Sequence, residues 1–500
     1  MQGYYPLFTA IPLGVAFLNL LVTKVSKKVS DLLAFLAMAV LAVMAVRMLF
    51  EPAFAYHVGN WKAPLGILLV SDGLSSMMLT IINVIGLLAV IYSMKYMTTY
   101  TAKPKYYTLY LLMIAGMNGV VMAGDMFNLY VFLEIASIAS YALVGFGCEK
   151  NELEASFKYL VLGGVASTAI LFGIAFLYSI TGTLNMPDLA QQLELYGINH
   201  AVAFVLALFI MGFGLKASSV PFHAWLPDAH PSAPAPISAM LSGVLIKALG
   251  IYSIARILFH VFGPEPMISS IVMFMGALSM VVGVFLAVGQ SDFKRMLAYH
   301  SISQMGYVTM GLGLGLNPNV PPAIAAMGLF GGLFHLVNHA VFKSALFLCS
   351  GSFEYRTGTR DKYAMGGLIR KMPVTGATCS IASLSISGVP PFNGFWSKLI
   401  IIMAFLQAGY WVYGSIAVLV AFMTLISFIR LQTGVLFGKL PERFAGVKEA
   451  PLAMTLPLVI LAILCLGIGL AYPWMDQGLL QAARDTLLDK MAYIGFLGNV

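Results

Sequence analysis

Residues 212–250 read GFGLKASSVPFHAWLPDAHPSAPAPISAMLSGVLIKALG, an apolar run, a break rich in serine and proline, and a second apolar run. Gly212 and Gly214 precede Lys216, and Pro221 follows it, so a regular helix is weakened at this point. Inside a membrane protein, a broken helix can expose backbone carbonyls and admit water, as in the ion sites of transporters. The stretch therefore predicts a discontinuous membrane helix with a lysine at its break, although Lys216 alone could also be a snorkelling lysine at a span end.

The composition of the whole chain places it in lipid. Of 500 residues, 60% are hydrophobic and 10% are charged, whereas soluble domains carry roughly 25% charged residues. No soluble core could hide so much apolar surface, so we expect an all-α polytopic membrane protein with one membrane domain in the lipid bilayer. The net charge of +8 could indicate nucleic-acid binding, but the basic residues are spread over short loops, so no nucleic-acid partner is expected.

The cysteines and the first residues exclude other classes of protein. Cys148, Cys349, Cys379 and Cys465 are far apart in sequence and form no CxxC pattern. We therefore expect no disulfide framework, no metal or iron–sulfur site and no cofactor. The first apolar stretch follows MQGYYP, without a basic region or a clear cleavage site, so we expect no cleavable signal peptide.

Apolar segments long enough to cross a bilayer, about 20 residues each, recur along the chain. The segment 373–406 contains Pro390 and Pro391, and because paired prolines interrupt the helix backbone we interpret it as one broken helix, not two spans. About fourteen candidate spans result: 6–23, 32–50, 76–94, 107–124, 126–146, 159–180, 202–218, 237–260, 267–288, 296–315, 322–350, 373–406, 411–434 and 452–473.

The basic residues of the predicted loops differ between the two sides of the membrane, with 18 on one side and three on the other. Positive charge gathers in cytoplasmic loops, so we expect a protein of the cell membrane with both termini on the outer side. The inner residues are Lys24, Lys27, Lys28, Lys95, Lys103, Lys105, Lys150, Lys158, Lys294, Arg295, Arg356, Arg360, Lys362, Arg370, Lys371, Lys439, Arg443 and Lys448; the outer ones are Lys62, Arg484 and Lys490.

Seven basic residues remain at membrane depth. Arg47, Arg256 and Arg430 lie within a few residues of span ends, where a long side chain reaches the interface, so we expect them to snorkel. Lys247, in AMLSGVLIKALGIY, lies near the middle of the span 237–260, where snorkelling is difficult and a functional role is favoured. The remaining lysines at depth are Lys216, Lys343 and Lys398.

Glu134 lies near the middle of the span 126–146, in MFNLYVFLEIASIASYALVGF. Among the 20 acidic residues, it is the one that we place deep inside a span. A carboxylate at this depth costs at least about 2.5 kcal/mol on insertion scales, so it should be paired, protonated or hydrated. A structural ion pair that fixes helix packing is the alternative, but intramembrane charges usually mark ion paths.

His335, His339 and Lys343, in GGLFHLVNHAVFKSALF, fall four residues apart, which places all three on one helix face. Two histidines at this spacing could share a metal ion, but no third ligand is near in sequence, so no metal site is expected. Histidine titrates near neutral pH, which favours a hydrated proton relay. A polar stripe that hydrogen-bonds to neighbouring helices is the alternative.

Lys398 follows a second break, in SLSISGVPPFNGFWSKLIII. This environment resembles that of Lys216, and the two lysines are about 180 residues apart. The pattern predicts a repeat of about five spans, each with one broken helix and one lysine. Paired discontinuous segments in two halves of a membrane protein are a pointer to a transport site.

Four stretches together resemble the antiporter-like subunits of respiratory complex I: residues 212–243, the segment around Glu134, DFKRMLAYHSISQMGYV and SGVPPFNGFWSK. They resemble still more closely the D-type subunit of Mrp cation/proton antiporters and its counterparts in membrane-bound hydrogenase and sulfane reductase complexes. The resemblance runs from about residue 70 to 440. The chain stops about 27 residues after the last predicted span and has a lysine at 398, and both facts favour a member of the D type.

The resemblance implies two inverted five-helix repeats, each supplying a half-channel. We accordingly expect three N-terminal helices in residues 1–106, a first repeat (helices 4–8) in 107–262, a second repeat (helices 9–13) in 263–436, and helix 14 with a C-terminal tail in 437–500.

The resemblance also implies roles for the buried charges. Glu134 and Lys216 would be the paired acid and base of the first half, and Lys247 the bridge. His335 and His339 would continue the polar axis to Lys398, the terminal lysine of the second half. His230, in LPDAH, would be either a relay or a brace for its loop.

We therefore expect a proton-translocating subunit without its own redox centre, working with other membrane subunits in a hetero-oligomeric complex. Such a complex could be an Mrp-type antiporter or a redox-driven pump, and sodium could pass through this chain or through a partner. A stand-alone secondary transporter of a small solute or cation is the competing hypothesis. A row of lysines and histidines without a carboxylate cluster fits protons better than sodium or sugar. A scaffold with a vestigial channel is the third, and an intact set of buried charges argues against it.

Overall fold

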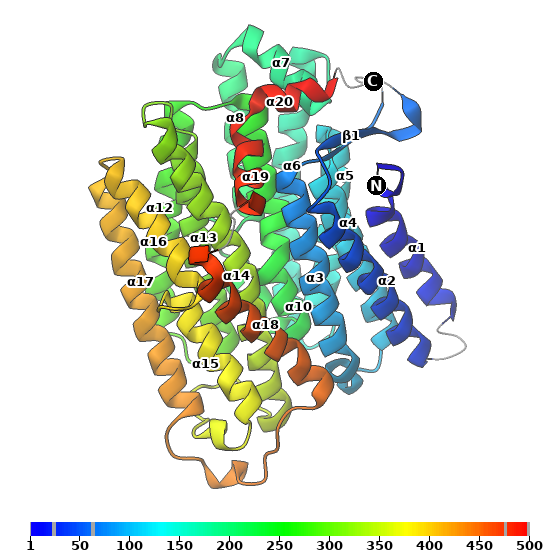
Figure 1. Cartoon of the computed structure of the whole chain (residues 1–500). Helices are drawn as coiled ribbons and strands as arrows, with labels where there is room; N and C mark the ends of the chain where they lie inside the picture. Colours follow the sequence, from blue (N-terminus) through cyan, green and yellow to red (C-terminus); the bar gives the residue numbers. More distant parts are fainter. Residues whose placement is uncertain (1, 23–26, 62–65, 475–477, 498–500) are drawn as a thin grey trace.

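The computed structural model describes residues 2–22, 27–61, 66–474 and 478–497, and it is built almost entirely of helices that run side by side (Figure 1). Ten helices of the described residues are long and apolar enough to cross a membrane, which agrees with the expected all-α polytopic membrane protein. Lys24 and Lys62, which contribute to the predicted charge asymmetry, lie outside the described residues.

Each of the predicted spans coincides with a helix or with a pair of helices. The predicted spans outside the ten long apolar helices are 107–124, 202–218, 296–315 and 373–406, and they coincide with α4, α8, α13 and the α15–α16 pair. The α-helices are α1 Leu7–Val22, α2 Lys27–Met48, α3 Gly73–Tyr96, α4 Lys103–Met122, α5 Met126–Val144, α6 Lys150–Thr181, α7 Met186–Tyr196, α8 His200–Lys216, α9 Leu226–Ser232, α10 Ala235–Met240, α11 Ser253–Arg256, α12 Pro266–Val288, α13 Phe293–Gly315, α14 Pro322–Thr357, α15 Pro373–Ser387, α16 Asn393–Gln407, α17 Trp411–Leu431, α18 Leu452–Ala471, α19 Gly478–Leu488 and α20 Lys490–Ile494.

Short 3₁₀ and π segments and one small hairpin complete the chain. The strands β1 Phe54–His57 and β2 Leu68–Ser71 pair antiparallel. The 3₁₀ segments are η1 Gln2–Tyr4, η2 Val58–Asn60, η3 Met97–Thr99, η7 Leu368–Arg370, η9 Glu442–Phe444, η10 Tyr472–Trp474 and η11 Gly495–Leu497. The π segments are η4 Leu241–Leu245, η5 Lys247–Tyr252, η6 Ile257–Phe262 and η8 Gln432–Leu436.

Two helices are interrupted where the sequence predicts it. The first ends at Lys216, and the chain passes through Ser218, which has a φ of 56°, and a cis bond before Pro221 to α9. The second ends at Gly388, with a φ of 79°, and resumes at Asn393 after a cis bond between two prolines. Proline and a left-handed residue both stop the helical hydrogen-bond ladder, so each break leaves backbone groups available to side chains.

The segment Ala235–Phe262 between α9 and α12 is one long rod of alternating α and π turns. The rod is buried along almost its whole length. Because a π turn bonds from residue i to i+5, it inserts an extra residue and disturbs the regular pairing of carbonyls. Lys247 begins the second π segment, η5.

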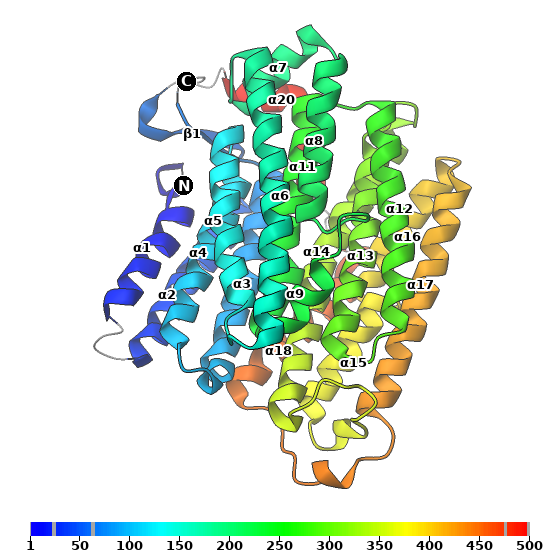
Figure 2. The ribbon, with the colours of Figure 1, turned by 180° about the vertical axis from the view of Figure 1, so that it is seen from behind.

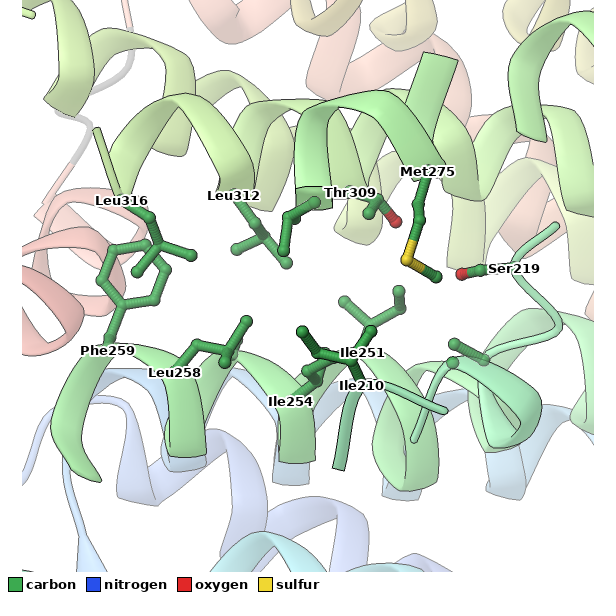
Figure 3. Close-up of a pocket in the computed structure, with 14 residues that line it drawn as sticks. Ile210, Ser219, Ile251, Ile254, Leu258, Phe259, Met275, Thr309, Leu312 and Leu316 are labelled. Atoms are coloured by element: carbon green, nitrogen blue, oxygen red, sulfur yellow. The ribbon is translucent and has the colours of Figure 1, made fainter. Parts of the chain in front are cut away.

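A small apolar cavity lies between the α8–η6 region and the α12–α13 pair (Figure 3). Isoleucine and leucine side chains from the rod face Met275 and Leu312 across it, with Ser219 at one end and Phe259 at the other. The cavity measures about 20 Å³, close to the smallest volume that holds one water, and so apolar a lining is expected to stay dry.

The C-terminal tail folds back onto the bundle. Figures 1 and 2 show α19 and α20 at the same end of the bundle as the first helix begins, and we call this the terminal end. The helix α19 packs so closely on α3 that a Cβ at Gly73 would lie 2.5 Å from the backbone of Ala482. The Lys490 ammonium pairs with Glu194 of α7 at 3.2 Å, so the tail joins the start of α3 to α7.

Candidate functional site

Glu134 and Lys216 meet inside the bundle, as the resemblance to the antiporter-like subunits implies. The Lys216 Nζ lies 3.6 Å from the Glu134 carboxylate, which also accepts a hydrogen bond from the Ser167 hydroxyl. The Lys216 side chain is 3% exposed and that of Glu134 is 26% exposed. The pair joins α5, in the first half of the chain, to the last residue of α8, where the helix breaks.

Hydroxyl groups hold Lys216 more closely than the carboxylate does. Its Nζ donates to the Ser137 hydroxyl at 2.9 Å and to the Tyr141 hydroxyl at 3.3 Å. Glu134, Ser137 and Tyr141 are spaced three and four residues apart, so all lie on one face of α5. The ammonium can therefore move between neutral and anionic partners without leaving this face.

Lys247 is fully buried, and its ammonium is satisfied by backbone alone. The Nζ donates to the carbonyls of Ser242 at 2.8 Å and of Gly243 at 2.6 Å. Both carbonyls belong to the π segment η4, whose altered pairing leaves acceptors for a side chain. A lysine held this way has no fixed counter-ion among the described residues.

The helix α14 carries His335, His339 and Lys343, and all three are fully buried. His335 Nδ1 lies 2.9 Å from the Ser397 hydroxyl, and His335 Nε2 lies 3.2 Å from Oε1 of the Gln304 side chain. Because an amide oxygen only accepts hydrogen bonds, Nε2 is the donor in the second contact.

His339 and Lys343 differ from His335. Neither ring nitrogen of His339 nor the Lys343 Nζ has a hydrogen-bond partner in the described part of the chain. Buried polar atoms without protein partners generally bind water. This face of α14 therefore combines one histidine held by two hydrogen bonds with two side chains whose polar atoms have no partner among the described residues.

Lys398 lies in the second half-helix of its pair, α16, and is 3% exposed. Its Nζ donates to the Ile386 carbonyl at 2.7 Å and lies 5.1 Å from the centre of the Tyr307 ring. The Ile386 carbonyl is freed because α15 ends at the break. In contrast to Lys216, Lys398 forms no ion pair with an acidic side chain of residues 66–474.

His230 lies on α9, directly beyond the first break, and is fully buried between aromatic rings. Its ring centroid is 6.0 Å from that of Trp225 and 5.8 Å from that of Phe347. The Lys343 Nζ lies over the same Phe347 ring at 5.8 Å. Neither ring nitrogen of His230 bonds to a described residue, so the ring places an open polar group beside Lys343 and braces nothing by hydrogen bonding.

Sequence reasoning missed a buried ion pair near the terminal end. Arg256 is 1% exposed and donates to both carboxylate oxygens of Asp72, at 2.6 and 2.9 Å. The prediction that Arg256 snorkels is therefore wrong. His260, one turn further along the rod, contacts Arg256 at 3.2 Å and the Thr486 carbonyl of the tail at 2.7 Å.

A further lysine lies deeper than predicted, and sequence reasoning also missed a buried histidine. Lys294, assigned to a loop from the sequence, has a side chain only 2% exposed that pairs with Glu354 at 3.3 Å. It lies in the first turn of α13, so the helix begins earlier than the predicted span. His300, on the same helix, is fully buried and contacts the Ser427 hydroxyl at 2.8 Å. His300 stood within one of the motifs that carry the resemblance, and that was its only sequence signal.

No group of three or more histidine, cysteine or acidic side chains that could hold a metal ion occurs among the described residues. The site is instead a row of isolated basic groups with one carboxylate at its beginning. Such a row suits the transfer of protons, because each group can take and release one.

Comparison with known proteins supports this interpretation. Residues 123–424 match the family described as NADH:quinone oxidoreductase/Mrp antiporter, transmembrane region, and residues 56–107 match the N-terminal region of complex I chain 5. The D-type subunit of the Na⁺/H⁺ antiporter of Alkalihalophilus pseudofirmus is 36% identical over 445 residues, which cover 88% of this chain and 87% of that protein. The N-type subunit of the NADH-quinone oxidoreductase of Desulforudis audaxviator is 34% identical over 507 residues, 97% of this chain and 99% of that protein.

Solved structures show the same fold. A protein of the Mrp complex from a Dietzia species superimposes with a TM-score of 0.90 at 28% identity, covering 99% of both chains. A protein of the archaeal membrane-bound sulfane sulfur reductase superimposes with a TM-score of 0.91 at 31% identity, covering 99% of this chain and 100% of that one.

Proposed function

This chain belongs to the NADH:quinone oxidoreductase/Mrp antiporter family, and from that premise we propose which of its residues move protons and in what order. The resemblance predicted from the motifs is confirmed. The chain is a multi-pass membrane protein and a proton-translocating, antiporter-like subunit of a multisubunit membrane complex.

The proposed path starts at the Glu134–Lys216 pair, and that contact carries the proposal. A lysine held mainly by hydroxyls, 3.6 Å from a carboxylate, can be drawn toward the carboxylate or released from it. When the carboxylate is protonated or moves away, the lysine loses the charge that stabilises its ammonium form and gives up its proton. The pair thus couples a change in a neighbouring subunit to a proton in this one.

Beyond the pair, we propose that protons pass along Lys247, Lys343, His339 and His335 to Lys398. The unpartnered atoms of His339 and Lys343 support hydrated steps between the braced groups. We also propose that His230 exchanges protons with Lys343, and the contact of both side chains with Phe347 supports this step.

The architecture that we propose for this path has fourteen membrane spans. Helices in 107–262 and 263–436 form two inverted repeats, each with one broken helix, preceded by three helices in 1–106 and followed by the last helix and tail in 437–500. The terminal end faces outward and the protein resides in the cell membrane. Partner subunits of the complex supply the driving force, either a redox reaction or an ion gradient that includes sodium.

The experiment is Glu134→Gln in inverted membrane vesicles that carry the complete complex. Glutamine keeps the size and the hydrogen bond but not the charge, so coupled proton transport should fall at least about 100-fold, as for loss of a proton-transfer group. Glu154→Gln, on the exposed surface of α6, makes the same chemical change and should leave transport unaltered. Normal transport by an assembled Glu134→Gln complex would overturn the proposal.

A further inference from the structure

A groove on the surface of the bundle, between α15 and α18, is not part of the proton path. It lies toward the end opposite the terminal end, where both helices begin (Figure 1). Its volume is about 400 Å³, and apart from one threonine its lining is apolar. Val374, Ala377 and Ile381 of α15 line one side, and Val459 and Ile463 of α18 line the other. The spacing of three or four residues places each set on one face of its helix.

The groove runs along the helices and is open to the surroundings of the chain. From Val374 to Ile381 it follows α15 for roughly 10 Å of α-helix. Val374 is 37% exposed, Val459 38% and Ile463 63%. Apolar side chains that are exposed on a membrane span meet hydrocarbon or another protein. Because acyl chains also run across the bilayer, the groove and an acyl chain have the same direction.

Three basic residues surround the start of α15, at one end of the groove. Lys371 is two residues before the helix begins. Lys448 is next to Glu449, whose carboxylate accepts a hydrogen bond from the Val374 amide at 2.8 Å. The Arg356 guanidinium donates to the Glu449 carbonyl, at 2.6 Å from Nη2 and 3.1 Å from Nε. The three residues therefore stand around the end of the groove at which Val374 lies.

None of the three cations is held in an ion pair. The Glu449 carboxylate is used by backbone and hydroxyl donors: besides the Val374 amide, it accepts from the Thr375 amide at 3.3 Å, the Thr375 hydroxyl at 2.6 Å and the Ala450 amide at 2.9 Å. Within the described ranges, no acidic side chain forms an ion pair with any of the three basic residues. Three positive charges and one carboxylate leave a net positive charge here, to which an anion from outside the chain can bind.

We propose that this groove binds an anionic phospholipid, with one acyl chain along α15 and the phosphate near Lys371 and Lys448. An acyl chain matches the apolar lining, and a phosphate accepts charge-assisted hydrogen bonds from ammonium groups. Basic pockets beside membrane helices bind anionic headgroups in this way. A neutral phospholipid has no net charge to balance the cations, and inorganic phosphate would leave the groove empty. The inference does not depend on the proton path.

A helix of a neighbouring subunit is the competing occupant, and the charges favour the lipid. A phospholipid joins its anionic group to its acyl chains at the boundary between headgroups and hydrocarbon, and the cations and the groove have the same arrangement. A helix would need an acidic side chain at the same level, and the lining offers it one threonine as a hydrogen-bond partner. One phospholipid molecule therefore matches both features.

The test uses the complete complex in phosphatidylcholine vesicles that contain a phosphatidylglycerol with a photoreactive group on one acyl chain. After illumination, we expect this lipid to be attached to peptides from residues 374–381 or 459–466. Unlabelled phosphatidylglycerol should compete for the site, and phosphatidylcholine should not. The double variant Lys371→Gln, Lys448→Gln should lower the labelling at least about tenfold, because each basic residue near an anionic headgroup contributes roughly a fivefold change in affinity.

Two further variants separate the headgroup from the groove. Lys105→Gln, Lys150→Gln removes two exposed charges at the same end, on α4 and α6, and should be labelled as the wild type is. Ala377→Phe places a ring in the groove at an exposed position and keeps all the charges, so it should also abolish the labelling. Wild-type labelling of Ala377→Phe or of the double variant at 371 and 448 overturns the proposal.

The lipid class decides between specific binding and ordinary contact. Equal labelling by a photoreactive phosphatidylcholine would mean that the groove only touches the bilayer. No labelling of the α15 and α18 peptides in the assembled wild-type complex would mean that a neighbouring subunit covers the groove. Either result overturns the proposed site, whether or not the complex transports protons.

Discussion

The lysines at the two broken helices have different bonding partners. At the first break, Lys216 has a carboxylate at 3.6 Å and two hydroxyls. At the second, Lys398 has a backbone carbonyl at 2.7 Å and an aromatic ring. A carboxylate can change its charge or its position, whereas a carbonyl fixed at a helix end can change neither. A change in the charge or position of the Glu134 carboxylate can therefore alter the proton affinity of Lys216. Lys398 has no such partner and responds only to a proton that reaches it along the path.

Of the substitutions that test this difference between the two lysines, Lys216→Arg should have the largest effect on proton transport. Arginine keeps a positive charge near Glu134, but it cannot release its proton in a protein. If the lysine must give up a proton, transport in vesicles falls to the background of the complex without this subunit. Lys158→Arg, at an exposed pair on α6, is the control. Substantial transport by Lys216→Arg would mean that the charge alone is needed.

Removing each lysine in turn should destabilise the complex by different amounts, and the difference measures how much each lysine depends on its partner. Lys216→Met leaves the Glu134 carboxylate without its cation, whereas Lys398→Met leaves only a carbonyl unsatisfied. An unpaired buried charge costs about 3–5 kcal/mol and an unpaired neutral group about 1–3 kcal/mol, and the 26% exposure of Glu134 reduces the first figure. We expect Lys216→Met to destabilise the purified complex more, by roughly 1–2 kcal/mol in denaturant unfolding. Equal losses would mean that the carboxylate is not a real partner.

Ser137→Ala should have the smallest effect. It removes the 2.9 Å hydrogen bond that holds Lys216 away from Glu134. A hydrogen bond of this kind contributes about 1 kcal/mol, so the balance between the two partners should shift about fivefold toward the carboxylate and change the rate by a similar factor. Ser140→Ala, whose hydroxyl bonds to Tyr159 and not to the lysine, is the matched control in the same transport assay. A rate identical to that of the control would mean that the hydroxyl does not hold the lysine.

The sequence predicted the helices and the first site better than the rest. Long apolar runs determine spans directly, because lipid sets this feature locally. Pro221 with its neighbouring glycines marked the first break and the Pro390–Pro391 pair marked the second, because proline interrupts the helix backbone. Burial alone predicted that the Glu134 carboxylate is paired, protonated or hydrated, and it was the resemblance that named Lys216 as its partner. The order of protons along the row and the limits of the repeats stay predictions.

What escaped the sequence depends on residues far apart along the chain. Arg256 lies near a span end, and only its partner Asp72, 184 residues away, shows that it is buried. The same is true of Lys294, whose partner Glu354 lies on α14. The amphipathic helices α7 and α19 were not predicted either, since they are too short and too polar to cross a membrane. The burial of these residues and the folding of these helices depend on contacts with distant parts of the chain, and a single sequence does not show which distant parts come into contact.

The dry cavity between the α8–η6 region and the α12–α13 pair has an electrical consequence (Figure 3). A cavity lined by apolar side chains does not hold a chain of water molecules, so protons cannot hop across this part of the interface between the rod and the α12–α13 pair. The same apolar region has a low dielectric constant, and charges interact more strongly through such a medium than through water. The cavity therefore prevents proton transfer between the rod and the α12–α13 pair at this point, while charges on either side still interact electrostatically.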